Sequence, residues 1–186
     1  MKILGIDPGS LSCGYGLISA QEIRNKKIGF NGNRRLNACS YIKSGRIVMT
    51  ESKLLHERLR DLYESLSEII TESEPDEIVI ERMFFAKGIK SALSLGQARG
   101  VVLLAASLSG LPIFEYTPLE VKQAVVGYGR ADKNQVQCMV REILGINHQL
   151  SSDGADALAA ALCHSHSQGA ISDLTRKAGR HRVVAL

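Results

Sequence analysis

The stretch KILGIDPGSLSCGYGLI, from Lys2 to Ile18, constrains the fold more than any other part of the chain. Two apolar runs flank a Pro-Gly-Ser turn, which predicts two antiparallel strands joined by a tight connection. Asp7 falls where the first strand ends, just before the turn. A carboxylate at the edge of a buried element costs free energy unless another group pairs with it. The rest of the chain therefore has to supply a partner for Asp7.

The remaining apolar spacing alternates between strand and helix periods. Strands are predicted at 38–49, 76–81 and 112–116, and helices at 52–74, 91–109, from 117, at 133–144 and at 151–166. Three early strands followed by alternating helices and strands indicate an α/β protein, with a mixed five-stranded sheet and helices on both faces. This order is that of the ribonuclease H-like fold, and a fold by itself gives no function.

Length and composition limit the class of protein. A chain of 186 residues fits a single domain, which we place at 1–170, followed by a basic, disordered tail at 171–186. The four cysteines form no CxxC pair, which favours buried thiols in a reducing compartment over a zinc site or disulfides. Residues 1–6 are too short for a signal-peptide core, and no apolar run approaches the ~18 residues that span a bilayer. We therefore expect a cytoplasmic protein that does not contact a membrane.

The net charge of +4 is unevenly distributed along the chain. Residues 21–46 and 82–141 are mainly basic, residues 51–81 are mainly acidic, and the last eleven residues carry bases and no acid. Basic segments around an acidic helix suit a polyanion bound on one side. On charge alone, a solvated surface with flexible ends explains the pattern equally well.

Four acidic residues occupy positions from which their carboxylates could form a catalytic or metal-binding site. Asp7 and Glu81 each close a short apolar strand, so their carboxylates can converge at one end of the sheet. Asp153 and Asp156 lie three residues apart at the start of the last predicted helix, on one helix face. The Asp153 and Asp156 pair also has a purely structural explanation, because serine and aspartate cap helices and acids stabilise a first turn.

If the four acids converge, their mutual repulsion raises at least one pKa unless cations neutralise them. Hard divalent ions with oxygen ligands are the simplest such cations, which predicts a Mg²⁺ or Mn²⁺ site. Two metals roughly 3.5 to 4 Å apart could activate a water and stabilise the leaving oxygen of a phosphodiester. The residues therefore lead to the hypothesis of metal-dependent phosphodiester hydrolysis.

Four stretches of the chain together closely resemble the RuvC family of bacterial Holliday junction endonucleases. They are ILGIDPGSLSCGYGLI, IVIERMFFAKGIKSALSLGQARGV, FEYTPLEVKQAVVGYGRADKNQVQCMV and DGADALAAALCH, in the order of the family, from Met1 to about His166. The resemblance implies a structure-specific endonuclease that resolves four-way DNA junctions by paired symmetric nicks in recombination and repair. It also implies a homodimer that cooperates with the RuvA and RuvB branch-migration proteins.

The resemblance assigns the catalytic and metal-binding roles to four residues. Two Mg²⁺ ions per active site, for which Mn²⁺ substitutes, are expected on Asp7, Glu81, Asp153 and Asp156.

It also assigns contacts with DNA. Phe84 matches an aromatic residue that stacks on a base at the unpaired junction centre, where stacking contributes about 1 to 3 kcal/mol. Its neighbour Phe85 is expected to pack inward. Lys122 and Lys133 match lysines near the scissile phosphate, where they would contact the DNA backbone.

Three small residues, Ala92, Gly96 and Gly100, lie four apart on the predicted helix 91–109. Ordinary core packing is the default explanation of such a spacing. Because the resemblance implies a twofold dimer suited to symmetric nicking, we expect this helix to contribute to the dimer contact.

Two features depart from the family or add to it. The basic segment 21–36 is longer than the usual connection, and it is either a further DNA contact or an insertion. The CHSH sequence at 163–166 has a metal-ligand spacing that we interpret as fortuitous, because Cys163 is expected to be buried in a helix. His148 could assist the acidic site, but a surface position is the simpler expectation.

Three other functions stay open at this point. A shorter relative that processes ribosomal RNA precursors has a similar opening strand and glycine turn, but it lacks the matches through LGQARG and VKQAVVG. An actin-like sugar kinase or ATPase would use GIDPGSLSCGYG to bind phosphate, but it needs a second domain. A catalytically inactive junction-binding protein would not need the four acids.

Overall fold

The computed structural model describes residues 1–21, 38–82 and 88–180, with side chains described as far as residue 168. Three strands come first, β1 (Lys2–Pro8), β2 (Ser12–Gln21) and β3 (Ala38–Val48). Helices and strands then alternate through α1 (Leu55–Ser73), β4 (Glu77–Glu81), α2 (Ile89–Leu108) and β5 (Ile113–Tyr116). The chain continues with three helices, α3 (Pro118–Val126), α4 (Lys133–Leu144) and α5 (Ser152–Arg180).

The five strands form one mixed sheet in the order β3-β2-β1-β4-β5. The pairs β1–β2 and β2–β3 are antiparallel, whereas β1–β4 and β4–β5 are parallel. In the parallel pair of β1 and β4, Ile6 lies opposite Ile80. The next residue of each strand is acidic, so Asp7 and Glu81 end neighbouring strands at the same edge of the sheet. The mixed sheet predicted from the sequence is confirmed.

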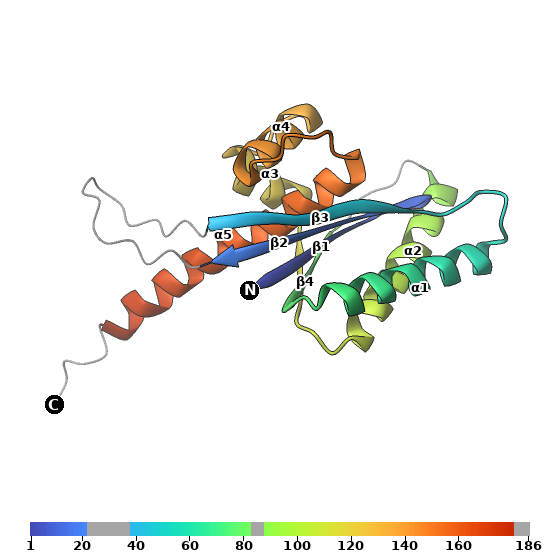
Figure 1. The fold of residues 1–186 in the computed structure, drawn as a ribbon, viewed down its shortest axis with the longest axis horizontal. Coiled ribbons are helices and arrows are strands. Elements are labelled where there is room, and N and C mark those ends of the chain that lie inside the picture. Colours follow the sequence, from blue (N-terminus) through green and yellow to red (C-terminus); the bar gives the residue numbers. More distant parts are fainter. Residues whose placement is uncertain (22–37, 83–87, 181–186) are drawn as a thin grey trace.

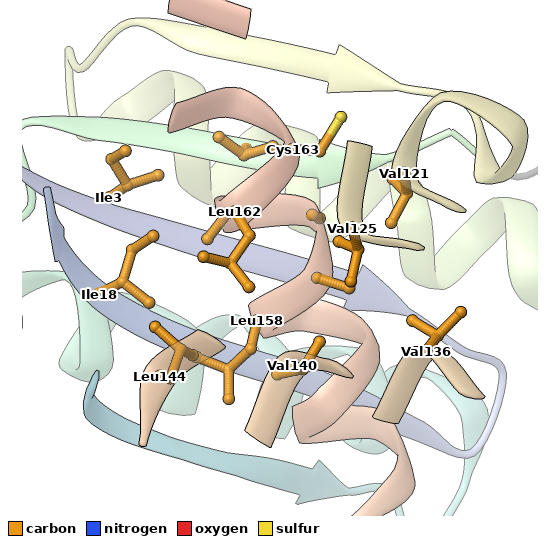
Figure 2. Packing of buried hydrophobic residues seen from close by; sticks show 14 of the residues in the cluster. Ile3, Ile18, Val121, Val125, Val136, Val140, Leu144, Leu158, Leu162 and Cys163 are labelled. Atoms are coloured by element: carbon orange, nitrogen blue, oxygen red, sulfur yellow. The ribbon is translucent and has the colours of Figure 1, made fainter. Parts of the chain in front are cut away.

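Helices cover both faces of the sheet, as predicted (Figure 1). Helices α1 and α2 pack on one face against a core that includes Leu4, Ile6 and Ile80. Helices α3, α4 and α5 cover the other face, where Leu158 and Leu162 of α5 lie between the strands and the two shorter helices (Figure 2). Burying these side chains supplies the main favourable free energy of the fold.

Helix α5 lies unusually close to the sheet because glycines face it. A Cβ on Gly5 would lie 2.0 Å from the carbonyl oxygen of Ala157, and one on Gly14 would lie 2.1 Å from that of Asp153. Real Cβ atoms do not approach oxygen so closely, so any larger residue would push the helix away. The glycines of the opening hairpin therefore set the distance between α5 and the strands.

Helix α5 runs through Arg180, so the prediction that it ends near residue 166 is wrong. Residues 167–180 include Ala170, Leu174 and Lys177, which are good helix formers, and no proline interrupts them. The C-terminal part of α5 extends beyond the edge of the sheet (Figure 1). Of the predicted tail, residues 181–186 lie outside the described residues.

Helix α2 bears on the expectation that no apolar run is long enough to span a bilayer. It is the single helix, among those within the described ranges, that is long and apolar enough to cross a membrane. The prediction considered only unbroken apolar runs, whereas α2 holds just two charged residues, Lys90 and Arg99, in 20. One side of α2 packs in the core through small and branched residues, namely Ala98, Val102, Ala105 and Ala106.

The expected burial of the cysteines holds for two of the four. Cys13 and Cys163 are buried, and Cys39 is partly exposed. Cys138 is exposed because the buried side of α4 is formed by Val136, Val140 and Leu144.

Candidate active site

Four carboxylates gather at the edge of the sheet where β1 and β4 end, and we call them the carboxylate cluster: Asp7, Glu81, Asp153 and Asp156. The first two side chains hydrogen bond to each other. The other two come from the first turns of α5, which packs directly on Gly14, the residue paired with Asp7 in the antiparallel ladder. The hydroxyl of Ser151 accepts a 3.2 Å hydrogen bond from the Gly154 N–H and so caps this helix.

Burial and mutual repulsion disfavour negative charge in the carboxylate cluster. Burial, followed by the charges of Asp156 and Asp153, raises the pKa of Asp7 to about 6. Burial, followed by the charges of Asp7 and Asp156, raises the pKa of Glu81 to about 8. The pKa of Asp156 is also raised, mainly by burial, although Lys133 opposes the shift. Such a group of acids attracts a cation.

Lys133 is the cation that the chain itself brings to the carboxylate cluster. Asp132 caps α4, accepting from the Gln135 N–H at 2.9 Å, and this cap fixes Lys133 as the first residue of the helix. Its Nζ lies 2.6 Å from Oδ2 of Asp156. Burial lowers the pKa of Lys133, but the contact with Asp156 more than offsets this, and the net direction is upward.

A cavity of about 210 Å³ lies beside the carboxylate cluster. Glu81, Asp156, Lys122 and Lys133 contribute to its lining, together with apolar groups of α3, α4 and α5. The structure thus brings both predicted lysines to the predicted acids.

Asp153 is held by a residue that the sequence did not single out. The hydroxyl of Ser12 donates a 2.6 Å hydrogen bond to Oδ2 of Asp153. Ser12 stands next to a turn, where serine is common for local reasons, so no sequence signal indicated this contact.

Arg99 is a second residue that was missed. Its guanidinium donates a 3.1 Å hydrogen bond to the main-chain carbonyl of Glu81 and also binds the carboxylate of Glu115 on β5. Arg99 therefore ties α2 to the strand end that carries Glu81. Arg99 lies in the LGQARG stretch, which supported the resemblance to the RuvC family but gave no role to this arginine.

The other predicted site residues lie apart from the carboxylate cluster. Ala92, Gly96 and Gly100 are exposed on α2, and nothing stands within 4 Å of a Cβ built on either glycine. Phe84 and Phe85 lie outside the described residues, as does most of the segment 21–36.

The two remaining histidine predictions have different outcomes. His148 is exposed and packs edge-on against Tyr41, with ring centroids 5.6 Å apart. His164 of the CHSH sequence is buried, and it bonds through Nε2 to Glu77 at 2.7 Å and through Nδ1 to the Tyr116 hydroxyl at 2.8 Å. The CHSH sequence therefore contributes a buried polar network rather than a ligand set.

Comparison with known proteins decides the family. The family of crossover junction endodeoxyribonuclease RuvC matches the chain over residues 3–164. The chain belongs to the RuvC family. It is 46% identical over 169 residues to RuvC of Citrifermentans bemidjiense, which covers 91% of this chain and 94% of the relative. It is also 46% identical over 184 residues to RuvC of Saccharophagus degradans, which covers 98% of each chain.

Solved structures agree with the RuvC assignment. RuvC of Thermus thermophilus in complex with its Holliday junction substrate matches with a TM-score of 0.79 and 30% identity, over 91% of this chain and 96% of that chain. The yeast mitochondrial Holliday junction resolvase Ydc2 matches with a TM-score of 0.62 and 14% identity, over 96% and 85% of the two chains, which shows the shared fold alone.

The resemblance, the ribonuclease H-like fold and the enzyme class predicted from the sequence are therefore confirmed. The chain is a crossover junction endodeoxyribonuclease, an enzyme of DNA recombination. The RuvC assignment decides against the kinase and against the processing of ribosomal RNA.

Proposed function

We propose that this chain resolves Holliday junctions by paired symmetric nicks, and that its carboxylate cluster binds two Mg²⁺ ions for phosphodiester hydrolysis. The observation that carries the proposal is the convergence of Asp7 and Glu81, at neighbouring strand ends, with two acids of α5. Action on a Holliday junction agrees with the RuvC relative that is solved in complex with that substrate.

The donor set suits hard divalent ions. All four side chains offer oxygen, and burial, followed by the charges of neighbouring carboxylates, raises the pKa of Glu81 and of Asp7, which supports a cation at this site. In residues 1–21, 38–82 and 88–180, no three His, Cys, Asp or Glu side chains are already grouped as a metal ion would need. The Asp156 carboxylate is engaged by Lys133, whose Nζ lies 2.6 Å from its Oδ2. Release of Asp156 from Lys133 would let its carboxylate turn toward Asp7 and Glu81.

When bound, the metal ions would lower the pKa of a water and neutralise charge on the phosphate. The chain's own residues supply positioning. Lys122 and Lys133 line the cavity beside Glu81 and would bind the backbone phosphate that enters it. Lys133 would then exchange the Asp156 carboxylate for the phosphate, which frees an oxygen of Asp156.

We also propose a homodimer formed through α2. Apolar side chains of this helix point to solvent, with Ile89 90% exposed and Leu93 63% exposed. Nothing lies within 4 Å of a Cβ built on Gly96 or Gly100, and Leu104, one turn further along the helix, is also exposed. Exposed apolar surface of this kind marks an interface, and a twofold pair of sites suits a four-way junction.

Further parts of the proposal rest on the family alone. Phe84 would stack on a base at the junction centre, and the chain would work in the cytoplasm with RuvA and RuvB. Residues 1–170 would form the nuclease domain, followed by the basic residues 171–186, of which 171–180 belong to α5.

The proposal is tested with a labelled mobile four-way junction, linear duplex and an RNA–DNA hybrid, each incubated with Mg²⁺ and the purified protein. We expect paired nicks in the junction alone, and loss of cleavage with retained junction binding in Asp7→Asn. Full activity of Asp7→Asn would refute the role of the carboxylate cluster. Junction binding without cleavage by the wild-type protein would instead leave an inactive binding protein.

A further inference from the structure

The hydrogen bond between Ser12 and Asp153 joins the start of β2 to the first turn of α5, across 141 residues of sequence. Its length of 2.6 Å lies in the range of an O–H donor on an ionised oxygen. Because a carboxylate only accepts, the serine hydroxyl is the donor. The bond therefore fixes the orientation of the Asp153 carboxylate through one of its two oxygens.

The backbones on both sides of this bond are fixed independently of it. The Met49 N–H donates to the carbonyl of Leu11 at 2.9 Å, which anchors the residue before Ser12 to the end of β3. Gly14, two residues further along β2 and so on the same face of the sheet, packs directly against the Asp153 carbonyl. With both backbones fixed, the Ser12 hydroxyl selects the rotamer of Asp153.

The two contacts on the α5 acids differ in charge. Lys133 carries a positive charge to Asp156, whereas Ser12 is neutral and leaves the full charge of Asp153 in place. A neutral donor that holds one oxygen and leaves the other free is the arrangement found in the outer shell of metal sites.

We propose that Ser12 is a positioning residue of the nuclease site, which holds Oδ2 of Asp153 so that Oδ1 is presented to a divalent metal ion. The inference rests on the proposed metal-binding role of the carboxylate cluster. Ser12 touches neither metal nor DNA in this role, and acts through Asp153 alone.

The first measurement is direct binding of Mn²⁺ to the full chain without DNA, by isothermal titration calorimetry and electron paramagnetic resonance. Loss of an outer-shell partner typically weakens metal affinity about 10- to 100-fold, and we expect Ser12→Ala to fall in this range. Ser12→Thr keeps the hydroxyl and should restore most of the affinity. Ser19→Ala, at the opposite end of the same strand, pairs with Lys2 and should leave Mn²⁺ binding unchanged.

The second measurement is a double-mutant cycle on the same binding constant. If Ser12 acts through Asp153, Ser12→Ala should have no further effect in an Asp153→Asn background. In cleavage assays, Ser12→Ala should need more Mg²⁺ for half-maximal rate, while junction affinity without metal stays the same.

The outcomes distinguish the role of Ser12 from the existence of the metal site. Unchanged Mn²⁺ affinity in Ser12→Ala, with binding abolished in Asp7→Asn, would overturn the role of Ser12 and leave the metal site standing. Equal losses from Ser12→Ala in wild-type and Asp153→Asn backgrounds would also overturn it, because the effect would then not pass through Asp153. Wild-type cleavage with no measurable Mn²⁺ binding, and full activity in Asp7→Asn, would refute the proposed metal site itself.

Discussion

Lys133 and Asp156 form an ion pair in which Nζ lies 2.6 Å from Oδ2, so the first residue of α4 contacts the second turn of α5. The lysine side chain is 56% exposed and the aspartate side chain 20% exposed, which leaves Nζ free to move toward solvent. The ammonium partly compensates a group of partly buried acids, and in the proposed reaction it would bind a phosphate instead. Substitution of Lys133 therefore tests the proposed contact with the phosphate most directly.

Lys133→Ala should slow junction cleavage on the order of 10²-fold, because it removes a charge positioned near the reacting phosphate. Single-turnover cleavage at saturating protein separates this effect from binding. The matched control is Lys53→Ala, which removes the exposed lysine of another short ion pair, 2.5 Å from Asp61 on α1. An unchanged rate in Lys133→Ala would contradict the proposed role.

The raised pKa of Glu81 predicts how stability depends on pH in the metal-free protein. Its pKa is about 8 in the folded state against 4.5 ordinarily, so between these values the folded state holds a proton that the unfolded state has lost. The free energy of unfolding contributed by Glu81 therefore falls as pH rises from about 4.5 to about 8.

Glu81→Gln should remove this decrease in the free energy of unfolding with rising pH, because glutamine does not ionise. With EDTA present, we expect the variant to be more stable than the wild-type chain at pH 8, on the order of 1 to 3 kcal/mol, and close to it at pH 4.5. Urea unfolding at both pH values measures the difference. A variant that is less stable at pH 8 would show that the carboxylate is not destabilising.

Gly96 offers a test of the dimer that spares the fold. A side chain at this position meets nothing within 4 Å, so Gly96→Lys should leave the folded subunit intact. Replacing a helical glycine even adds about 0.5 to 1 kcal/mol of helix stability. We expect the wild-type chain to sediment as a dimer at micromolar concentration and Gly96→Lys as a monomer.

The control for that experiment is Thr71→Lys, which adds the same charge to an exposed position of α1. It should keep the sedimentation behaviour of the wild-type chain. A wild-type monomer, or a dimer that tolerates Gly96→Lys, would exclude α2 as the interface.

His164→Ala should destabilise the protein by about 2 to 4 kcal/mol, because it removes two side-chain hydrogen bonds made by a buried residue and opens a cavity. The affected partners are Glu77 and the hydroxyl of Tyr116, and the ring of Phe114 loses its contact with the imidazole at 4.2 Å. Thermal unfolding measures the loss. Cleavage well below the unfolding temperature should persist, and its abolition would indicate a role beyond structure.

The sequence predicted the parts of the site that have local signals. Asp7 and Glu81 end apolar strands, and Asp153 and Asp156 share one helix face, so these positions indicated that the four acids could converge, although helix capping also explained the second pair. The mixed five-stranded sheet and the layers of helices on its two faces followed from the order of the elements, whereas the strand order was not predicted.

The residues whose roles were not predicted act through contacts between segments that are distant in the sequence. Ser12 acts through Asp153, and Arg99 through the carbonyl of Glu81, and neither pairing leaves a pattern in the residues beside it. His164 was set aside as part of a fortuitous spacing for the same reason, because its partner Glu77 belongs to a strand 87 residues away. The length of α5 was missed because its second half carries no amphipathic signal tied to the core.

The carboxylate cluster takes its acids from β1, the first element described, from β4, and from α5, the last element described. During synthesis, Asp7 leaves the ribosome long before Asp153 and Asp156 are made. Helix α5 must then pack against the glycines of the opening hairpin before the four carboxylates come together. On the proposed mechanism, a nascent chain, or one truncated before α5, lacks two of the four acids and would not cut DNA until α5 has been made and has folded onto the sheet.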